Sequence, residues 1–313
     1  MNKRLIGAIL AGAMLLPAGS VHAEAAKAKT PVMLQGEMPI EVLYNARKIL
    51  FDVRPRIVEG TVLIPVRYVS EKLQASVAIE GRTVLVVKGD RTVKLTIGSR
   101  EATINGKNVT LAQPAIVENG RTLVPIRVIS EGLGVPVRWD EVARFVWVGN
   151  EDVPKMEDVA ELVDINPFLP YYKGRELYLD IFESGKLATQ AYMLDYSDFP
   201  FILNNSIYYR WDLTKDSNGA SYIKSTTNQS GAMGTGLFYL ASGNMFRNRP
   251  EIPGFREIIG EFRIHYYNIA FRTDLDSLGD TNWAKFTLKE AQYIGINSDR
   301  INSFPVLVKN PFK

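Results

Sequence analysis

The sequence predicts an α+β fold that is mainly β, in which a duplicated strand–helix–strand domain precedes a second, β-rich domain. Three observations support this prediction. Residues 60–73 and 120–133 align without a gap, sixty positions apart, and share seven identical residues. An Asn-Gly pair, the strongest short signal for a β-hairpin turn, occurs in the second copy at Asn105-Gly106. Beyond residue 150, the β-branched and aromatic residues that favour strands dominate.

The duplication covers most of the first half of the chain without a gap. Seven residues recur at equivalent positions, and the match extends back to Glu41 and Glu101 and forward to Val77 and Val137. The recurring residues are Gly60, Leu63, Pro65, Arg67, Ser70, Glu71 and Leu73 in the first copy, and Gly120, Leu123, Pro125, Arg127, Ser130, Glu131 and Leu133 in the second. So many identities at one fixed offset indicate an internal repeat.

Local rules predict the elements of each copy. Residues 101–111 alternate around the Asn-Gly pair and predict a hairpin. Pro125 suits the first position of a helix, where its missing N–H would lack a partner in any case, and Gly134 suits a left-handed helix end. The apolar face of this helix consists of residues at helical spacing, namely Ile126, Ile129 and Leu133. Returning strands are expected at residues 137–140 and 145–148.

The second copy also resembles a known family. Its segment Asn119–Asp140, NGRTLVPIRVISEGLGVPVRWD, is similar to the copper amine oxidase N-terminal-like domain, or stalk domain, of secreted and surface proteins from Gram-positive bacteria. The resemblance covers about residues 31–150 and implies a small antiparallel sheet curled around short helices. The signature positions that it implies are Pro65, Arg67, Glu71, Pro125, Arg127, Glu131, Leu133, Gly134 and Trp139.

The first copy departs from this pattern at the end of its helix. Lys72 and Gln74 replace the two glycines of the second copy, and Ile79 replaces Trp139. A left-handed helix end favours glycine, so these replacements put the cap of the first helix in question. The general shape of the copy is expected to be unaffected.

The resemblance does not extend to the catalytic part of an amine oxidase. Copper there is held by a cluster of imidazole ligands, but beyond the start of the chain a single histidine, His265, is present. No segment of the kind that houses a tyrosine-derived quinone is found. We therefore expect no amine oxidase activity, no metal and no cofactor, and we interpret the duplicated domain as a spacer or docking module.

The start of the chain has the pattern of a secretory signal peptide. Lys3 and Arg4 precede an apolar run at residues 5–16, and small residues lead to a cleavage site after Ala23. Residues 1–23 are therefore predicted to direct secretion, and the mature protein is expected outside the cell, in the medium or at the cell wall. No later segment reaches eighteen uninterrupted apolar residues, so no membrane span is expected in the mature protein.

Composition excludes further classes of function. The chain has no cysteine, which rules out disulfides, thiolate metal sites and thiol catalysis. Removal of Lys3 and Arg4 lowers the formal net charge by two, from +3 to +1, so no nucleic-acid partner is expected. All but six of the 14 Phe, 14 Tyr and 4 Trp lie beyond residue 150, which separates the duplicated domain, residues 31–150, from a β-rich domain, residues 151–313.

Alternating and aromatic stretches predict the strands of the second domain. Hairpins are expected within residues 177–193 and 206–225, followed by a long strand at residues 261–272. Thr287–Glu290 has the sequence of a capping box, which predicts a short helix through Tyr293. One or two helices would therefore accompany a mainly β domain.

Adjacent aromatic residues predict a recognition surface in this domain. The residues concerned are Tyr208, Tyr209, Trp211, Tyr266 and Tyr267. Neighbouring side chains in a strand point to opposite faces of the sheet, so each pair is expected to place one ring toward solvent. Exposed rings supply rigid contact area for sugars and proteins, so we predict that these residues bind a cell-envelope polysaccharide or a surface protein. In the alternative, both sheet faces are covered and the rings belong to the core.

Acidic residues support an enzymatic alternative. Glu257 and Glu261 are four positions apart and would share one face if helical, which suits an acid–base pair in glycan hydrolysis. No Gly-x-Ser-x-Gly motif nominates a nucleophile for His265, so this histidine is interpreted as a packed residue.

Two further patterns have possible ligand-binding chemistry. Residues 231–236 are rich in glycine but lack the Lys-Ser/Thr that follows a phosphate-binding loop, so they are interpreted as a flexible loop. Residues 274–282 and 212–218 space oxygen ligands in the manner of a calcium loop, but no bidentate Glu follows. They are interpreted as solvated turns, with calcium as the alternative.

These observations predict a non-catalytic secreted or cell-wall-associated protein, in which the duplicated domain presents an aromatic-rich recognition module. A secreted glycan hydrolase that uses carboxylates is the alternative. A third hypothesis is a structural subunit that assembles through a sheet edge of the duplicated domain.

Overall fold

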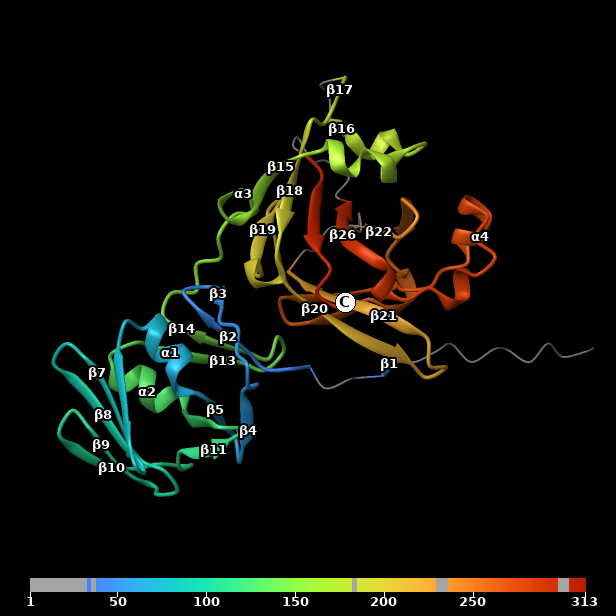
Figure 1. Ribbon diagram of the computed structural model, residues 1–313. Helices are drawn as coiled ribbons and strands as arrows, with labels where there is room; N and C mark the ends of the chain where they lie inside the picture. Colours follow the sequence, from blue (N-terminus) through green and yellow to red (C-terminus); the bar gives the residue numbers. More distant parts are fainter. Residues whose placement is uncertain (1–32, 35–37, 182–184, 229–235, 298–303) are drawn as a thin grey trace, which may run out of the picture. The chain divides into compact units, whose positions relative to one another are not determined.

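The computed structural model describes residues 33–34, 38–181, 185–228, 236–297 and 304–313 (Figure 1). All of them belong to one unit of the chain, Val32–Lys313. Strands dominate and helices are few and short, which confirms the mainly β prediction. The predicted signal peptide and residues 231–235 of the glycine-rich run lie outside the described residues. Within the described ranges, no helix is long and apolar enough to cross a membrane.

Each copy of the repeat folds into strands around one short helix, as predicted. The first copy consists of β2 (Glu41–Tyr44), β3 (Arg47–Lys48), β4 (Arg56–Val58), β5 (Thr61–Pro65), α1 (Val66–Lys72), β6 (Ser76–Glu80) and β7 (Thr83–Lys88). After β8 (Arg91–Thr96), the second copy consists of β9 (Glu101–Ile104), β10 (Lys107–Thr110), β11 (Ile116–Glu118), β12 (Arg121–Pro125), α2 (Ile126–Gly132), β13 (Val137–Asp140) and β14 (Phe145–Val148). The predicted Asn-Gly hairpin forms between β9 and β10.

The two copies meet in a shared sheet. Its order is β4-β5-β12-β11, and the central strands β5 and β12 are antiparallel. Ile64 lies opposite Val124, its equivalent in the second copy. The flanking pair Leu63–Pro125 on one side is equivalent to the pair Leu123–Pro65 on the other. This register relates the copies by a local twofold axis between Ile64 and Val124. The repeat therefore builds one intertwined structure, which we call the N-terminal region (residues 38–150).

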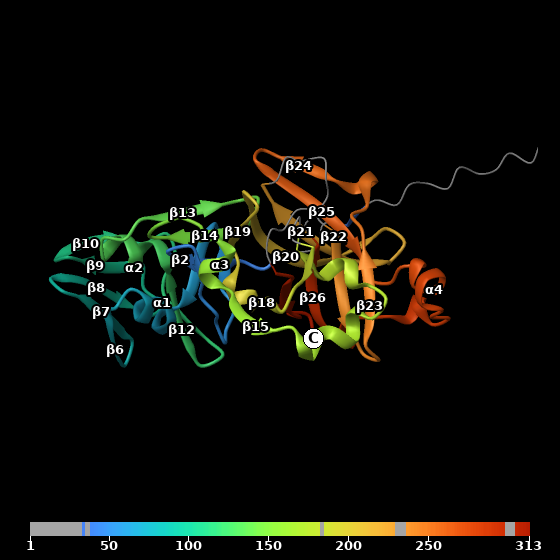
Figure 2. The same ribbon diagram turned by 90° about the horizontal axis from the view of Figure 1, so that it is seen from above.

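The symmetry ends at the flanking sheets. In one of them β8 is inserted between β7 and β9, giving the order β6-β7-β8-β9-β10. In the other, with the order β13-β14-β2-β3, β14 pairs directly and in parallel with β2 (Figure 2). The segment between the copies thus adds a strand that the first flanking sheet contains and the second lacks.

Each helix begins directly after a proline and ends at a left-handed residue. Pro65 and Pro125 each lie one position before the first helical residue. The sequence predicts instead that the proline is the first helical residue. After α2, Gly134 takes a φ of +81°, as predicted. After α1, Gln74 takes a φ of +57°, although it carries a Cβ atom. The first helix therefore ends like the second despite its missing glycine.

Two six-stranded sheets form most of the C-terminal region (residues 151–313), and one of them also includes a strand from the start of the described chain, β1. The first has the order β1-β20-β21-β25-β24, with β19 paired to β20, and the second has the order β15-β18-β27-β26-β22-β23. Their strands are β1 (Met33–Leu34), β15 (Glu161–Asp164), β18 (Gln190–Leu194), β19 (Phe201–Leu203), β20 (Ser206–Asp216), β21 (Ser221–Thr227), β22 (Gly236–Ala241), β23 (Met245–Arg249), β24 (Glu257–Ile259), β25 (Phe262–Asn268), β26 (Ala291–Asn297) and β27 (Val306–Lys309). One core of aromatic and aliphatic side chains joins the two sheets.

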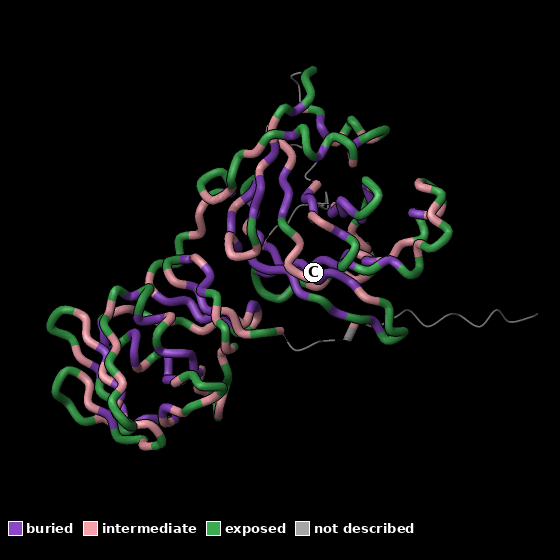
Figure 3. The backbone as a smooth tube through the Cα atoms, viewed as in Figure 1, coloured by how far each residue is buried: buried purple, intermediate pink, exposed green. Residues whose placement is uncertain are grey.

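The local predictions for this region are confirmed in part. The hairpin β20–β21 and the strand β25 form as expected. A strand was predicted at residues 177–182, but residues 177–179 lie in a 3₁₀ turn (Glu176–Leu179). Only the short pair β16 (Asp180–Ile181) and β17 (Lys186–Leu187) remains of that hairpin. The capping box at Thr287 forms, but it starts a single 3₁₀ turn, and Tyr293 lies in β26. Buried positions concentrate along the strands and exposed ones at the turns (Figure 3).

Candidate functional site

The five aromatic residues predicted to contact a ligand are all buried. The exposed fraction is 2 % for Tyr208, 6 % for Tyr209, 1 % for Trp211, 3 % for Tyr266 and 1 % for Tyr267. The prediction that each pair directs one ring toward solvent is therefore wrong. Both faces of the sheet that carries them are covered, so the alternative, in which the rings belong to the core, describes this structure.

Different neighbours cover the two faces of this sheet. Tyr208, Trp211 and Tyr267 lie in the core shared with the second sheet. The ring of Tyr209 points the other way and packs 6.4 Å from Phe145 in β14 of the N-terminal region, measured between centroids. The sheet face that was expected to recognise a ligand is therefore covered by Phe145, which lies 64 positions earlier in the same chain.

The two candidate acids do not form a catalytic pair on a helix. Glu257 lies in β24, and its carboxylate accepts a hydrogen bond from the hydroxyl of Tyr266. Burial, together with this carboxylate, raises the pKa of Tyr266. Glu261 lies exposed in the turn that follows Gly260. The helical spacing on which the pairing depended is absent, because these residues form a β-hairpin.

His265 is a packed residue on β25, as interpreted, but it has partners that the sequence does not reveal. Its Nδ1 lies 3.0 Å from Oε1 of Glu251, and its Nε2 lies 3.2 Å from Oγ1 of Thr227. Burial raises the pKa of Glu251, but hydrogen bonds from Arg256 and His265 outweigh this effect and hold the pKa below its ordinary value. Carboxylate, imidazole and hydroxyl follow the order of a nucleophilic triad. Thr227 is only 1 % exposed.

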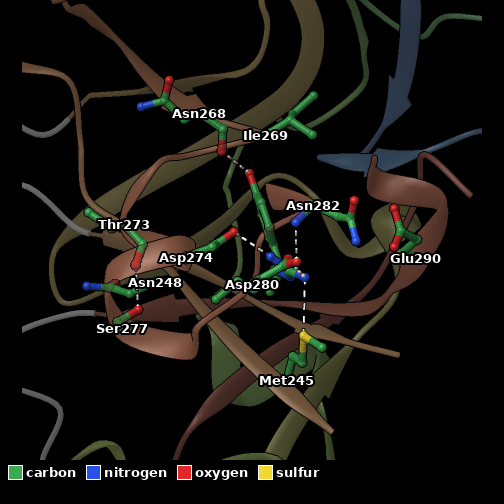
Figure 4. A network of polar contacts seen from close by, with 12 residues as sticks. Met245, Asn248, Asn268, Ile269, Thr273, Asp274, Ser277, Asp280, Asn282 and Glu290 are labelled. Atoms are coloured by element: carbon green, nitrogen blue, oxygen red, sulfur yellow. Dashed lines mark hydrogen bonds and ion pairs between the residues drawn. The ribbon is translucent and has the colours of Figure 1, made fainter. Parts of the chain in front are cut away.

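The acidic run at residues 274–282 is engaged by arginines. Asp274, on α4 (Thr273–Leu278), accepts hydrogen bonds from Arg247 at 2.5 Å and from Arg249 at 2.7 and 2.9 Å. Asp280 accepts one from Arg247 at 2.8 Å. Figure 4 shows Asp274 and Asp280 within one network of polar contacts. Among the described residues, no group of three or more acidic or histidine side chains is placed to hold a metal ion.

The second acidic run, residues 212–218, is engaged by backbone N–H groups and by one arginine. Asp216 accepts hydrogen bonds at 2.9 Å from the backbone N–H groups of Asn218 and Ala220, which closes the β20–β21 turn. Asp212 pairs with Arg210. Both runs therefore stabilise the fold.

Arg210, on β20, links the two regions from a fully buried position. Its guanidinium donates to both carboxylate oxygens of Asp212, at 2.7 and 2.6 Å. It also donates to the carbonyl oxygens of Pro39, at 3.1 Å, and Ala143, at 2.8 Å. A single side chain of the C-terminal region thus satisfies two backbone acceptors of the N-terminal region.

Glu41 extends this cluster to a buried lysine. Its carboxylate lies 3.7 Å from the Arg210 guanidinium and 2.6 Å from Nζ of Lys48. The same Nζ lies 3.5 Å from the ring centroid of Tyr196. Burial lowers the pKa of Lys48 to about 8, although the ion pair with Glu41 opposes this shift. Burial also shifts the pKa of the neighbouring Tyr196, in this case upward, because the charged form of a tyrosine is the anion.

Two adjoining pockets lie beside the cluster and form the candidate site. Their volumes are about 670 and 360 Å³, and both are lined by Met38, Pro39, Arg54 and Lys224. The larger, which we call the junction pocket, also contains Arg56, Glu141, Arg144 and the apolar side chains Ile57, Ile259 and Ile264. The smaller also contains Glu41, Tyr196 and Asp212. A concave site with convergent charged groups is the usual setting for ligand binding.

Sequence reasoning missed every residue of the junction pocket. Arg54, Arg144 and Lys224 come from a connection before β4, the turn before β14 and the middle of β21. Such residues form no motif, because only the fold brings them together. Two weak signals were present: Arg144 directly precedes a strand, and Lys224 interrupts a run of strand-forming residues.

The signature residues of the repeat line a second pair of pockets. One, of about 400 Å³, contains Pro65, Arg67, Glu71 and Gly120, and the other, of about 550 Å³, contains Pro125, Arg127, Trp139 and Gly60. Each pocket combines the helix start of one copy with the turn of the other copy, so the two are equivalent. Arg127 pairs with Glu131 at 3.8 Å on the exposed helix face.

Comparison with known proteins agrees with this architecture. No curated protein matches the chain. The match that is found covers the intertwined part of the N-terminal region, from Leu43 in β2 to Val148 at the end of β14. Residues 43–148 match the family model of the copper amine oxidase N-terminal domain, and this chain contains that domain followed by a β-rich region.

Proposed function

We propose that this chain is a non-catalytic protein of a Gram-positive cell exterior, secreted or attached to the wall, that acts by binding an envelope polysaccharide or a surface protein. The observation that carries the proposal is the charged junction pocket beside the buried Arg210 cluster. Such a site is preformed, so ligand binding requires little ordering of the protein. The leader-like start of the sequence supports export.

The contacts of the reactive side chains favour binding over catalysis. Glu257 accepts a hydrogen bond from Tyr266, and Asp274 is held between two arginines. His265 is buried between Glu251 and Thr227. A general acid or base must reach a proton of the substrate, and each of these groups is already engaged by another side chain of the protein.

The test is binding of the chain from residue 24 onward to purified Gram-positive envelopes, measured by sedimentation. We expect saturable binding, and protease treatment of the envelopes distinguishes a polysaccharide from a protein partner. A chain cut at residue 150 is a poor control, because the cut would expose Tyr209 and Arg210, which pack against the N-terminal region. Absence of saturable binding contradicts the proposal.

A secreted hydrolase is the second candidate, favoured by the contacts among Thr227, His265 and Glu251. Its test is turnover of envelope glycans and esters by the wild type and by Thr227→Val and His265→Gln. Turnover that is lost in both variants at an unchanged melting temperature would overturn the non-catalytic proposal. No turnover by the wild type would leave binding as the function.

A further inference from the structure

The junction pocket has a surplus of positive charge. Four cationic side chains line it, namely Arg54, Arg56, Arg144 and Lys224, and a single carboxylate, that of Glu141. Arg56 is neutralised by an ion pair with Glu118 outside the pocket, and the Glu141 carboxylate accepts a hydrogen bond of 2.5 Å from Nε1 of Trp139. Three cations therefore face the pocket without a carboxylate partner among the described residues.

Lys224 is the most deeply placed of the three. It is 8 % exposed, and its Nζ contacts the sulfur of Met38 at 3.4 Å. The acids nearest to it are engaged elsewhere: Asp212, its cross-strand neighbour, by Arg210, and Glu257 by Tyr266. Burial lowers the pKa of Lys224, which reflects this incomplete compensation. Buried charges are normally paired, so an unpaired one that lines a pocket indicates a missing anion.

Arg144 supports the same conclusion by independent geometry. Its Nε is buried and has no hydrogen-bond partner among the described residues. Its backbone takes a φ of +50°, a left-handed conformation that is strained for a residue with a side chain. Arg54, by contrast, is an exposed residue of the pocket lining, and it forms no ion pair within the described part of the chain.

We propose that the junction pocket binds a phosphate group carried by an organic molecule, with Arg54, Arg144 and Lys224 as its ligands. Guanidinium groups match the oxygens of phosphate with paired N–H donors, and lysine adds a point charge. Three unpaired cations and the carboxylate of Glu141 leave a net charge near +2, which suits an anion of charge near two better than a single carboxylate. The apolar side chains Ile57 and Ile259 would contact the organic part of the ligand. This inference rests on the proposed binding function and names the chemistry of its ligand.

The test compares three probes by calorimetry at low salt: glucose 6-phosphate, glucuronate and glucose. We expect glucose 6-phosphate to bind at millimolar or lower concentration, at least tenfold more tightly than glucuronate, and glucose not to bind. The pocket variants are Arg144→Gly and Lys224→Met, and each is expected to weaken phosphate binding at least tenfold. Lys107→Gln, on the exposed strand β10, is the control and should bind as the wild type does.

Both pocket variants are chosen to keep the fold. Glycine relieves the left-handed strain at position 144, and methionine matches the buried stem of Lys224 without its charge. Unchanged melting temperatures in both would show that lost binding is local. No phosphate binding by the wild type, equal binding of glucuronate, or full binding by both variants would each overturn the proposal.

Envelope sedimentation separates this inference from the broader function and identifies the source of the phosphate. Release of the chain from envelopes by glucose 6-phosphate indicates a phosphate-bearing polymer, whereas probe binding without release indicates a free organic phosphate. If both pocket variants bind phosphate and envelopes like the wild type, the pocket assignment fails while the binding function stands. If the wild type does not bind envelopes, the function itself fails.

Discussion

Arg210 donates a hydrogen bond of 2.8 Å to the carbonyl oxygen of Ala143, a residue that lies 67 positions earlier in the chain. This contact joins a strand of the C-terminal region to the last turn of the repeat. A guanidinium in the interior is tolerated only when its donors are satisfied, and here Asp212 and two backbone carbonyls satisfy them. The two regions therefore depend on each other for the stability of this cluster.

Replacing Arg210 with Met should destabilise the whole protein. The change leaves Asp212 and Glu41 as buried carboxylates with fewer partners, and breaking such a cluster costs about 3–5 kcal/mol in the free energy of unfolding. Urea denaturation measures this loss. Arg127→Met is the matched control, because its ion pair at 3.8 Å is exposed and contributes about 0.5 kcal/mol or less. Equal effects of the two changes would contradict the role of Arg210.

Lys48 should give stability a distinct pH dependence. Burial lowers its pKa to about 8 in the folded state, against 10.5 for the free side chain. Between these values the unfolded chain binds more protons at this residue, so the free energy of unfolding should rise as pH increases from 8 to 10.5. The measurement is the difference between the pH profiles of wild type and Lys48→Met, in which the contributions of tyrosines that do not contact Lys48 cancel. A difference that stays constant over this range would refute the prediction.

The two helix ends offer a reciprocal pair of substitutions. Gln74→Gly should raise the free energy of unfolding by up to about 1 kcal/mol, because Gln74 is held at a φ of +57°. Gly134→Gln should lower it by about 1 kcal/mol or more, since a Cβ at φ +81° is strained and would also lie 2.9 Å from Cζ of Arg91. Thermal unfolding of both variants checks the signs. Changes of the same sign would show that the two caps are not equivalent.

Asp274→Asn should be among the most damaging single substitutions. It removes the charge that holds Arg247 and Arg249, whose side chains are 4 % and 0 % exposed. The expected cost is about 3–5 kcal/mol. Asp280→Asn is the comparison, since Asp280 pairs with one arginine, Arg247, and is 14 % exposed, and it should cost clearly less. Chemical denaturation of the two variants provides the ranking.

Calcium should not stabilise this protein. The acidic runs at residues 212–218 and 274–282 have oxygen ligands at suitable spacing. However, Asp212, Asp274 and Asp280 are held by arginines, and Asp216 accepts hydrogen bonds from backbone N–H groups. A cation would have to compete with these contacts to bind there. Addition of millimolar calcium is therefore expected to leave the melting temperature unchanged, and a marked increase would show that a calcium site exists.

Local patterns predicted local structure well. The Asn-Gly hairpin at residues 101–111, the helix end at Gly134 and the hairpin β20–β21 depend on residues a few positions apart, and all three form. The strand predicted at residues 177–182 did not form fully, because the 3₁₀ turn at Glu176–Leu179 takes its place. The capping box at Thr287 was identified correctly, but β26 begins at Ala291 and ends the turn early.

The candidate site was beyond such reasoning. The two-residue period of a strand identified the rings of Tyr208 and Tyr209 as facing opposite ways, but not that Phe145 covers the second one. Likewise, the pairing of His265 with Thr227 depends on two strands that are adjacent in space and 38 residues apart in sequence. The three unpaired cations of the junction pocket come from three separate segments and have no common sequence signature.

By itself, the sequence determined that the first half is a duplicated unit and that the chain is rich in strands, because identity at a fixed offset and short-range periodicity are properties of neighbouring residues. Only the tertiary structure decided that Ile64 and Val124 meet on a local twofold axis, that the aromatic residues are core, and that Arg54, Arg144 and Lys224 share a pocket. Burial and charge pairing are set by whichever segments pack together, and that packing is a property of the whole chain.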